Sequence, residues 1–152
     1  MKPILPILVG GLTLALLAGC TTPGAYKKRS DLVSNPAACA AKRFEVYFDQ
    51  DQARLTTAAR EAISLTATQL QGCDVTKVQV LGLADARSGT AAANQSLSER
   101  RARSVAEALS SAGLPAPAFE VAASGADGAV VNGVNDPLRR RTEVLIEAGP
   151  RR

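Results

Sequence analysis

The spacing of apolar residues switches between two periods along the chain, and this alternation limits the fold more than any other feature of the sequence. From Phe44 to Phe48 every second residue is apolar, the pattern of a strand with one buried face. A helical spacing follows, from a cap at Thr56 to a stop at Gly72, with the apolar stripe Ala59, Ile63, Ala67 and Leu70. These residues predict one strand–helix unit.

A second strand–helix unit is expected further along. Val78 and Val80 alternate with polar residues and lead into Gly82, and a loop is predicted over residues 83–95. Ser96-Leu97-Ser98-Glu99 has the capping-box pattern, which predicts that a helix begins here. That helix ends at Gly113 and carries the stripe Ala102, Val105, Leu109 and Ala112.

Two further strands complete the expected order. Phe119 to Ala123 is the third, residues 125–137 are predicted to be a loop, and the fourth runs from Thr142 to Glu147. The order is β-α-β-α-β-β. Because strand–helix–strand crossovers are right-handed, both helices are expected on one face of a mixed sheet, as an α+β two-layer sandwich.

The N-terminal segment has the features of an export signal. Lys2 precedes an apolar stretch from Ile4 to Leu17, and small residues lead to Cys20. Leu17-Ala18-Gly19-Cys20 resembles the bacterial lipobox, which implies removal of residues 1–19 and acylation of Cys20 as a lipid anchor. The alternatives are an ordinary cleaved signal and an uncleaved membrane anchor, for which the stretch is too short and interrupted.

Residues 20–38 lack helical or strand periodicity and are interpreted as the acylated cysteine and a tether. The domain is predicted over residues 39–148, with a short tail at 149–152. By the lipoprotein resemblance, Thr21 after the anchor, where an Asp would retain the protein in the inner membrane, favours the outer membrane. The expected localisation is therefore a lipid-anchored protein of the outer membrane with its domain in the periplasm.

Composition excludes several function classes. The chain has no histidine, which removes Ser-His-Asp and Cys-His catalysis and the common zinc motifs. A net charge of +4 and 3% aromatic residues disfavour nucleic-acid binding. A wall hydrolase would need paired carboxylates, for which Asp49, Asp51 and Glu99 are the candidates, but solvation explains these acids more simply. No enzyme, cofactor or metal is predicted.

Several motifs, in the right order, resemble the OmpA-like peptidoglycan-binding domain, which includes the peptidoglycan-associated lipoproteins. The resemblance covers residues 44–147 and implies that family's fold. The motifs that carry it are Val46-Tyr47-Phe48-Asp49, Leu55-Thr56, Gly82-Leu83-Ala84-Asp85-Ala86-Arg87, Asn94, Leu97-Ser98-Glu99-Arg100-Arg101-Ala102 and Arg139-Arg140-Arg141-Thr142-Glu143-Val144.

The resemblance also implies a ligand site for the stem peptide of the cell wall, through diaminopimelate. Asp85 would take the ammonium group and Arg101 the carboxylate, with a planar fork suited to two parallel bonds. Asn94 would organise the loop, and Leu97 and Arg140 would complete the site.

The residues themselves allow the same site without the family. Asp85 follows the second strand, and Arg101 lies in the first turns of the next helix, whose unpaired N–H groups near Leu97 and Ser98 would attract a carboxylate. The alternative is that Asp85 only shapes a turn and Arg101 is a solvated helix arginine.

Three positions depart from the family pattern. Leu83 stands where many members have an aromatic residue or His, one extra residue separates Asp85 from Asn94, and Arg139 replaces the usual Asn. The function predicted is non-covalent binding of peptidoglycan, tethering the outer membrane to the wall. The alternative is the same fold used to bind a protein partner in an envelope or secretion complex.

Cys39 precedes the first strand and Cys73 follows the first helix. A helix that returns antiparallel to its strand brings these two points together, so a Cys39–Cys73 disulfide is predicted in the oxidising periplasm. Two buried thiols and a metal site remain the alternatives.

Overall fold

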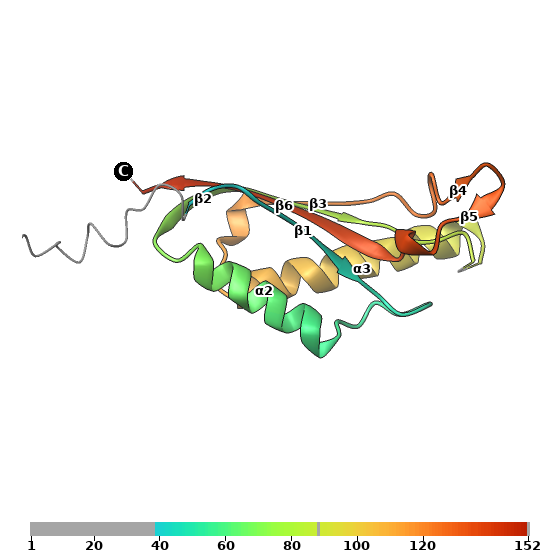
Figure 1. Ribbon diagram of the computed structural model, residues 1–152, viewed down its shortest axis with the longest axis horizontal. Helices are drawn as coiled ribbons and strands as arrows, with labels where there is room; N and C mark the ends of the chain where they lie inside the picture. Colours follow the sequence, from blue (N-terminus) through green and yellow to red (C-terminus); the bar gives the residue numbers. More distant parts are fainter. Residues whose placement is uncertain (1–38, 88, 152) are drawn as a thin grey trace, which may run out of the picture.

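Both helices lie on the same face of a four-stranded sheet in the computed structural model, which describes residues 39–87 and 89–151 (Figure 1). The order across the sheet is β1-β6-β2-β3; β2 and β3 are parallel, and the other pairs are antiparallel. The α+β sandwich with a mixed sheet is confirmed. Its elements are β1 Lys42–Tyr47, α2 Thr57–Gln69, β2 Cys73–Gly82, α3 Ala91–Ser111, β3 Phe119–Ala123 and β6 Arg141–Pro150.

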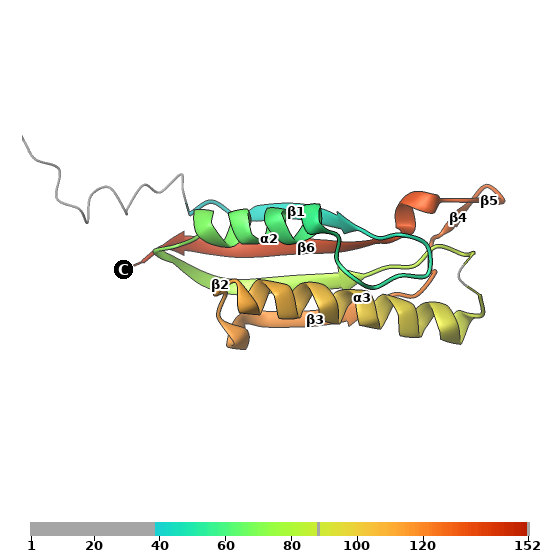
Figure 2. The ribbon, with the colours of Figure 1, turned by 90° about the horizontal axis from the view of Figure 1, so that it is seen from below.

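Alternation along the strands builds the core between the two layers. The strand residues that face the helices are 0–3% exposed: Val46, Val78, Val80, Val144 and Ile146. Figure 2 shows α2 alongside β1 and β6, and α3 alongside β2 and β3. The helices contribute Ile63, Ala67, Ala102, Val105 and Leu109, all buried at helical spacing.

The second long helix begins earlier than its capping-box pattern predicts. Thr90 is the N-cap, with its Oγ1 accepting the Ala93 N–H at 3.2 Å, and the helix starts at Ala91. The prediction of a start at Ser96 is wrong because three alanines after Thr90 have the highest helix propensity, although they show no apolar periodicity. Leu97 and Ser98 therefore lie inside α3.

The segment predicted as a loop over residues 125–137 contains a small hairpin. Strands β4 Val130–Val131 and β5 Val134–Asn135 pair around Asn132-Gly133, which have φ angles of 53° and 77°. Asn-Gly is the sequence typical of such a two-residue turn. The hairpin projects at the end of the sheet opposite the C-terminus (Figure 1).

The predicted disulfide is confirmed: Cys39 is bonded to Cys73, with their Cα atoms 5.5 Å apart. Cys73 is the first residue of β2, which begins directly after the turn that ends α2. Opposite it, β6 continues to Pro150, so two residues of the predicted tail pair with the sheet. Cys20 and the tether lie outside the described residues. Among the described residues, no helix has the length and apolar character needed to cross a membrane.

Candidate ligand-binding site

Asp85 lies in the loop that follows β2, and its side chain is 0% exposed. The backbone on both sides of it is fixed. The Ala84 N–H donates to the Gly125 carbonyl at 2.7 Å, and the Ala86 N–H donates to Oδ1 of Asn135 at 2.8 Å. The buried carboxylate is thus held in one position by the segment between β3 and β6.

Arg140 is the cation paired with this carboxylate. It follows a short 3-10 turn, Pro137–Arg139, and its Nη1 lies 3.1 Å from Oδ2 of Asp85. The Arg140 side chain is 28% exposed, whereas Asp85 is 0% exposed. Arg140 is therefore the member of the pair that solvent, or a ligand, meets first.

Arg101 lies ten residues after the start of α3, further along the helix than predicted, and the alternative that it is a solvated helix arginine is wrong. Its side chain is 0% exposed and bonds to three backbone carbonyls: Nε to Gln52 at 2.8 Å, Nη1 to Leu83 at 2.9 Å and Nη2 to Asp49 at 3.2 Å. Its guanidinium carbon also lies 5.1 Å from the centre of the Phe48 ring. Three of its five N–H groups thus hold the loop after β1 against the loop after β2.

The electrostatics of Arg101 reflect this burial. Desolvation lowers its pKa to about 10, opposed most strongly by the nearby charge of Asp85, which raises it. The group therefore remains charged at neutral pH. Asp85, Arg140 and Arg101 form one electrostatic cluster in which the anion and the helix arginine are buried and Arg140 reaches the surface.

Asn94 and Leu97 lie in the first two turns of α3 and are each 3% exposed. Nδ2 of Asn94 donates to the Gly89 carbonyl at 3.4 Å, which links the helix to the loop that carries Asp85. The N–H groups near Leu97 and Ser98, predicted to attract a carboxylate, lie within α3 and are not at its start. That part of the predicted site is wrong, because the helix begins five residues before Ser96.

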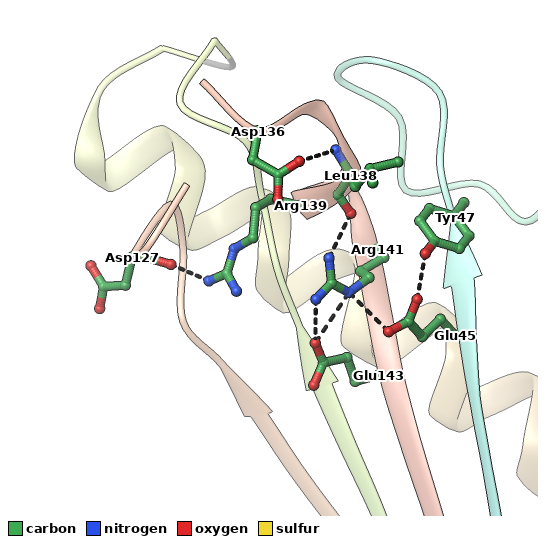
Figure 3. Close-up of polar contacts among 8 residues, drawn as sticks. All are labelled: Glu45, Tyr47, Asp127, Asp136, Leu138, Arg139, Arg141 and Glu143. Carbon is green, nitrogen blue, oxygen red and sulfur yellow. Dashed lines mark hydrogen bonds and ion pairs between the residues drawn. The ribbon is translucent and has the colours of Figure 1, made fainter. Parts of the chain in front are cut away.

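The three consecutive arginines before β6 have separate partners. Arg139 donates to the Asp127 carbonyl, and Arg141 pairs with Glu143 at 2.7 Å and, across the strand pair, with Glu45 at 3.4 Å (Figure 3). Figure 3 shows both side chains turned toward these partners. Arg140 alone of the three is bonded to Asp85.

Sequence reasoning missed Asn135, which contacts the loop of Asp85 from the hairpin. The turn signal Asn132-Gly133 between valines would have placed a hairpin here, although not the contact itself. Across residues 39–87 and 89–151, no three His, Cys, Asp or Glu side chains are grouped so that they could hold a metal ion.

The sequence of this chain is similar to those of known proteins. The profile of the OmpA family matches residues 47–142. Outer membrane protein A of Escherichia fergusonii is 34% identical over 103 residues, which are 66% of this chain and 42% of that protein. The outer-membrane lipoprotein YfiB of Pseudomonas aeruginosa is 34% identical over 107 residues, 68% of this chain and 63% of that one. The chain thus spans less than two thirds of either relative.

Solved structures show the same fold. The OmpA-like domain of FopA1 from Francisella tularensis has a TM-score of 0.60 at 25% identity, covering 72% of this chain and 73% of that one. The peptidoglycan-associated lipoprotein of Burkholderia pseudomallei has a TM-score of 0.59 at 26% identity, covering 69% and 90%. The C-terminal domain of Helicobacter pylori MotB, at 16% identity and a TM-score of 0.58, shares the fold over 69% of this chain and 83% of that one.

Proposed function

Since the chain belongs to the OmpA family, we propose that its domain binds peptidoglycan non-covalently and that the protein tethers the outer membrane to the cell wall. Two relatives support this by name: one is an outer-membrane lipoprotein, and one is a peptidoglycan-associated lipoprotein.

The observation that carries the proposal is the buried carboxylate of Asp85 beside the partly exposed guanidinium of Arg140. The end of a diaminopimelate side chain carries an ammonium and a carboxylate, so a fixed anion next to a fixed cation matches it charge for charge. The ammonium would bind Asp85. The carboxylate would bind Arg140 and the N–H groups of Arg101 that the backbone carbonyls leave over.

The residues of the proposed site are held rigidly, which favours ligand binding. The Asp85 loop is bonded on both sides, and Arg101 is locked by three carbonyls, so ligand binding orders few additional groups. A preorganised site loses less conformational entropy on binding. Asn94 and Leu97 would form the wall of the site on α3.

The placement of the site along the domain suits a tether. Cys39, the first described residue, is bonded to Cys73 at the start of β2, whereas Asp85 follows the other end of that strand. β2 has ten residues and spans roughly 33 Å. In Figure 2 the chain enters at one end of the sandwich, and the loops of the site lie at the other. A chain anchored before Cys39 would thus present Asp85 away from the membrane.

The anchor itself would be Cys20, acylated after removal of residues 1–19, with residues 20–38 as the tether. Several acyl chains on one cysteine bind a bilayer firmly, whereas one chain binds marginally. The protein would then lie on the periplasmic side of the outer membrane. Labelling with radioactive palmitate, compared between the native chain and a Cys20→Ala variant, tests this part.

Co-sedimentation of the full chain, in detergent, with purified peptidoglycan tests the ligand half. Asp85→Ala should abolish sedimentation with the wall, while Asp74→Ala, an exposed aspartate at the far end of β2, should not change it. Circular dichroism must show that all variants are folded. A folded native chain that stays in the supernatant contradicts the proposal.

A second candidate function, binding of a protein partner in the envelope, is favoured by one observation. Val130, Val131 and Val134 of the hairpin are 53%, 58% and 69% exposed. Exposed apolar side chains gathered on one projection are typical of protein contacts. Under this reading, the native chain would fail to bind the wall, and Val131→Lys would weaken capture of an envelope protein.

A further inference from the structure

Asn135 connects the β4–β5 hairpin to the loop that carries Asp85. Its Oδ1 accepts the Ala86 N–H at 2.8 Å, one residue beyond the buried carboxylate. The hairpin is in turn closed at its base, where the Asp136 N–H donates to the Ala129 carbonyl at 2.7 Å. Asn135 therefore lies on a braced element and touches the backbone that positions Asp85.

The contact with Ala86 also fixes which way the Asn135 amide faces. Because an N–H group must meet an oxygen, Oδ1 points at Ala86 and the NH2 group points away from it. Among the described residues, Nδ2 of Asn135 is buried and meets no acceptor, and the same holds for Nε of Arg140. A buried donor without an acceptor costs about 1–3 kcal/mol, so two of them in one cluster require an explanation.

We propose that Asn135 is a further residue of the ligand site, which positions Asp85 through Ala86 and donates from Nδ2 to the carboxylate of the bound stem peptide. This rests on the proposed function. Nδ2 of Asn135 and Nε of Arg140 are donors, so they would bind an anion and not the ammonium, which Asp85 takes; one buried acceptor of the site, Oδ1 of Asn94 on α3, is also without a donor. Arg140, 28% exposed, is the surface side chain of this cluster, and a carboxylate would reach the two buried donors when this side chain turns aside.

Two substitutions separate the two roles of Asn135. Asn135→Asp keeps an oxygen for the Ala86 N–H but replaces the NH2 donor with a second carboxylate oxygen. Asn135→Ala removes both groups. Asn132→Asp is the matched control, because it adds the same charge to the exposed turn of the same hairpin, at a φ of 53° that Asp tolerates.

The test is calorimetric titration of the full chain in detergent with two probes, diaminopimelic acid and cadaverine. Cadaverine keeps the two ammonium groups of diaminopimelic acid and has neither carboxylate. We expect the native chain to prefer diaminopimelic acid, and Asn135→Asp to lower that affinity at least tenfold and to erase the preference. Asn132→Asp should bind as the native chain does, and cadaverine binding by Asn135→Asp shows that the variant is folded and that Asp85 still takes an ammonium group.

Three results would overturn the inference. Native affinity for diaminopimelic acid in Asn135→Asp, with loss in Asp85→Ala, would leave the proposed function standing and remove Asn135 from the site. Loss in Asn135→Ala together with native binding by Asn135→Asp would reduce Asn135 to a positioning residue without a donor role. A folded native chain that binds neither probe would overturn the proposed function, and this inference with it.

Discussion

Gly82 of β2 and Ser98 of α3 lie backbone against backbone: a Cβ atom at Gly82 would stand 2.0 Å from the Ser98 carbonyl oxygen. Asp85 follows Gly82 by three residues, and Arg101 follows Ser98 by three. This one contact therefore sets how far the loop carboxylate lies from the helix arginine. No side chain other than hydrogen allows the strand and helix to approach so closely.

Substitution of Gly82 tests this contact. Gly82→Ala should destabilise the domain by about 2–4 kcal/mol, because the atom it meets is backbone and α3 must shift to admit it. Urea unfolding followed by circular dichroism measures the change. Gly149→Ala is the control, since nothing lies within 4 Å of a Cβ there, and it should leave the midpoint nearly unchanged. Equal midpoints for the two variants would contradict the close approach.

Arg101 should matter for folding as well as for any ligand. Arg101→Ala removes a buried cation and leaves three carbonyls, of which that of Leu83 is buried, without donors, and it should lower the free energy of unfolding by about 3 kcal/mol or more. Arg101→Lys should restore little of it, because an ammonium cannot reach three carbonyls held in the plane of a guanidinium. Arg100→Ala, on the exposed side of the same turn, should change stability by less than about 0.5 kcal/mol. Thermal unfolding of the three variants ranks them.

The two charges of the Asp85–Arg140 pair should contribute unequally to binding. Asp85→Ala is expected to cost about 2–5 kcal/mol of peptidoglycan binding, because the ligand's ammonium loses the desolvated carboxylate that pairs with it. Arg140→Gln should cost less, since Arg101 still offers a positive charge beneath it. Dissociation constants for soluble wall peptides measure both. A larger loss for Arg140→Gln than for Asp85→Ala would place the main ligand contact on the arginine.

Reduction of the disulfide should weaken the domain. The bond closes a loop with a sequence separation of 34, for which the chain-entropy relation gives about 4 kcal/mol. The melting temperature should fall when a reductant is added to the native chain. It should not respond in a Cys39→Ser, Cys73→Ser double variant, which controls for other effects of the reductant. Two thiols detected by mass spectrometry in protein exported to the periplasm would contradict the bond.

The sandwich is predictable from the sequence because apolar and polar residues alternate along its main strands. The predicted strand Phe119–Ala123 has the same bounds as β3, and strand–helix geometry correctly predicts the Cys39–Cys73 bond. The start of α3 is not predictable in the same way, because the alanines after Thr90 lengthen the helix without adding an apolar stripe. The capping-box pattern at Ser96 therefore predicts a helix start that the structure does not have.

The site was less predictable than the fold. Arg101 is bonded to carbonyls 18, 49 and 52 positions away, and backbone carbonyls are the same for every residue type, so no sequence pattern marks them. The hairpin that carries Asn135 has strands of two residues, which are too short to show an alternation of apolar and polar residues. Only its Asn-Gly turn was visible.

The position of the disulfide decides how the domain would carry a mechanical load. Tension from an anchored N-terminus enters at Cys39, crosses the bond to Cys73 and runs along β2 to the loop of Asp85. Residues 40–72, with β1 and α2, are bypassed and feel little of that force. β2 lies between β6 and β3, so its ladders on both sides are pulled in shear and must yield together. Membrane and wall would thus be joined through an interior strand of the sheet, with a neighbour on each side.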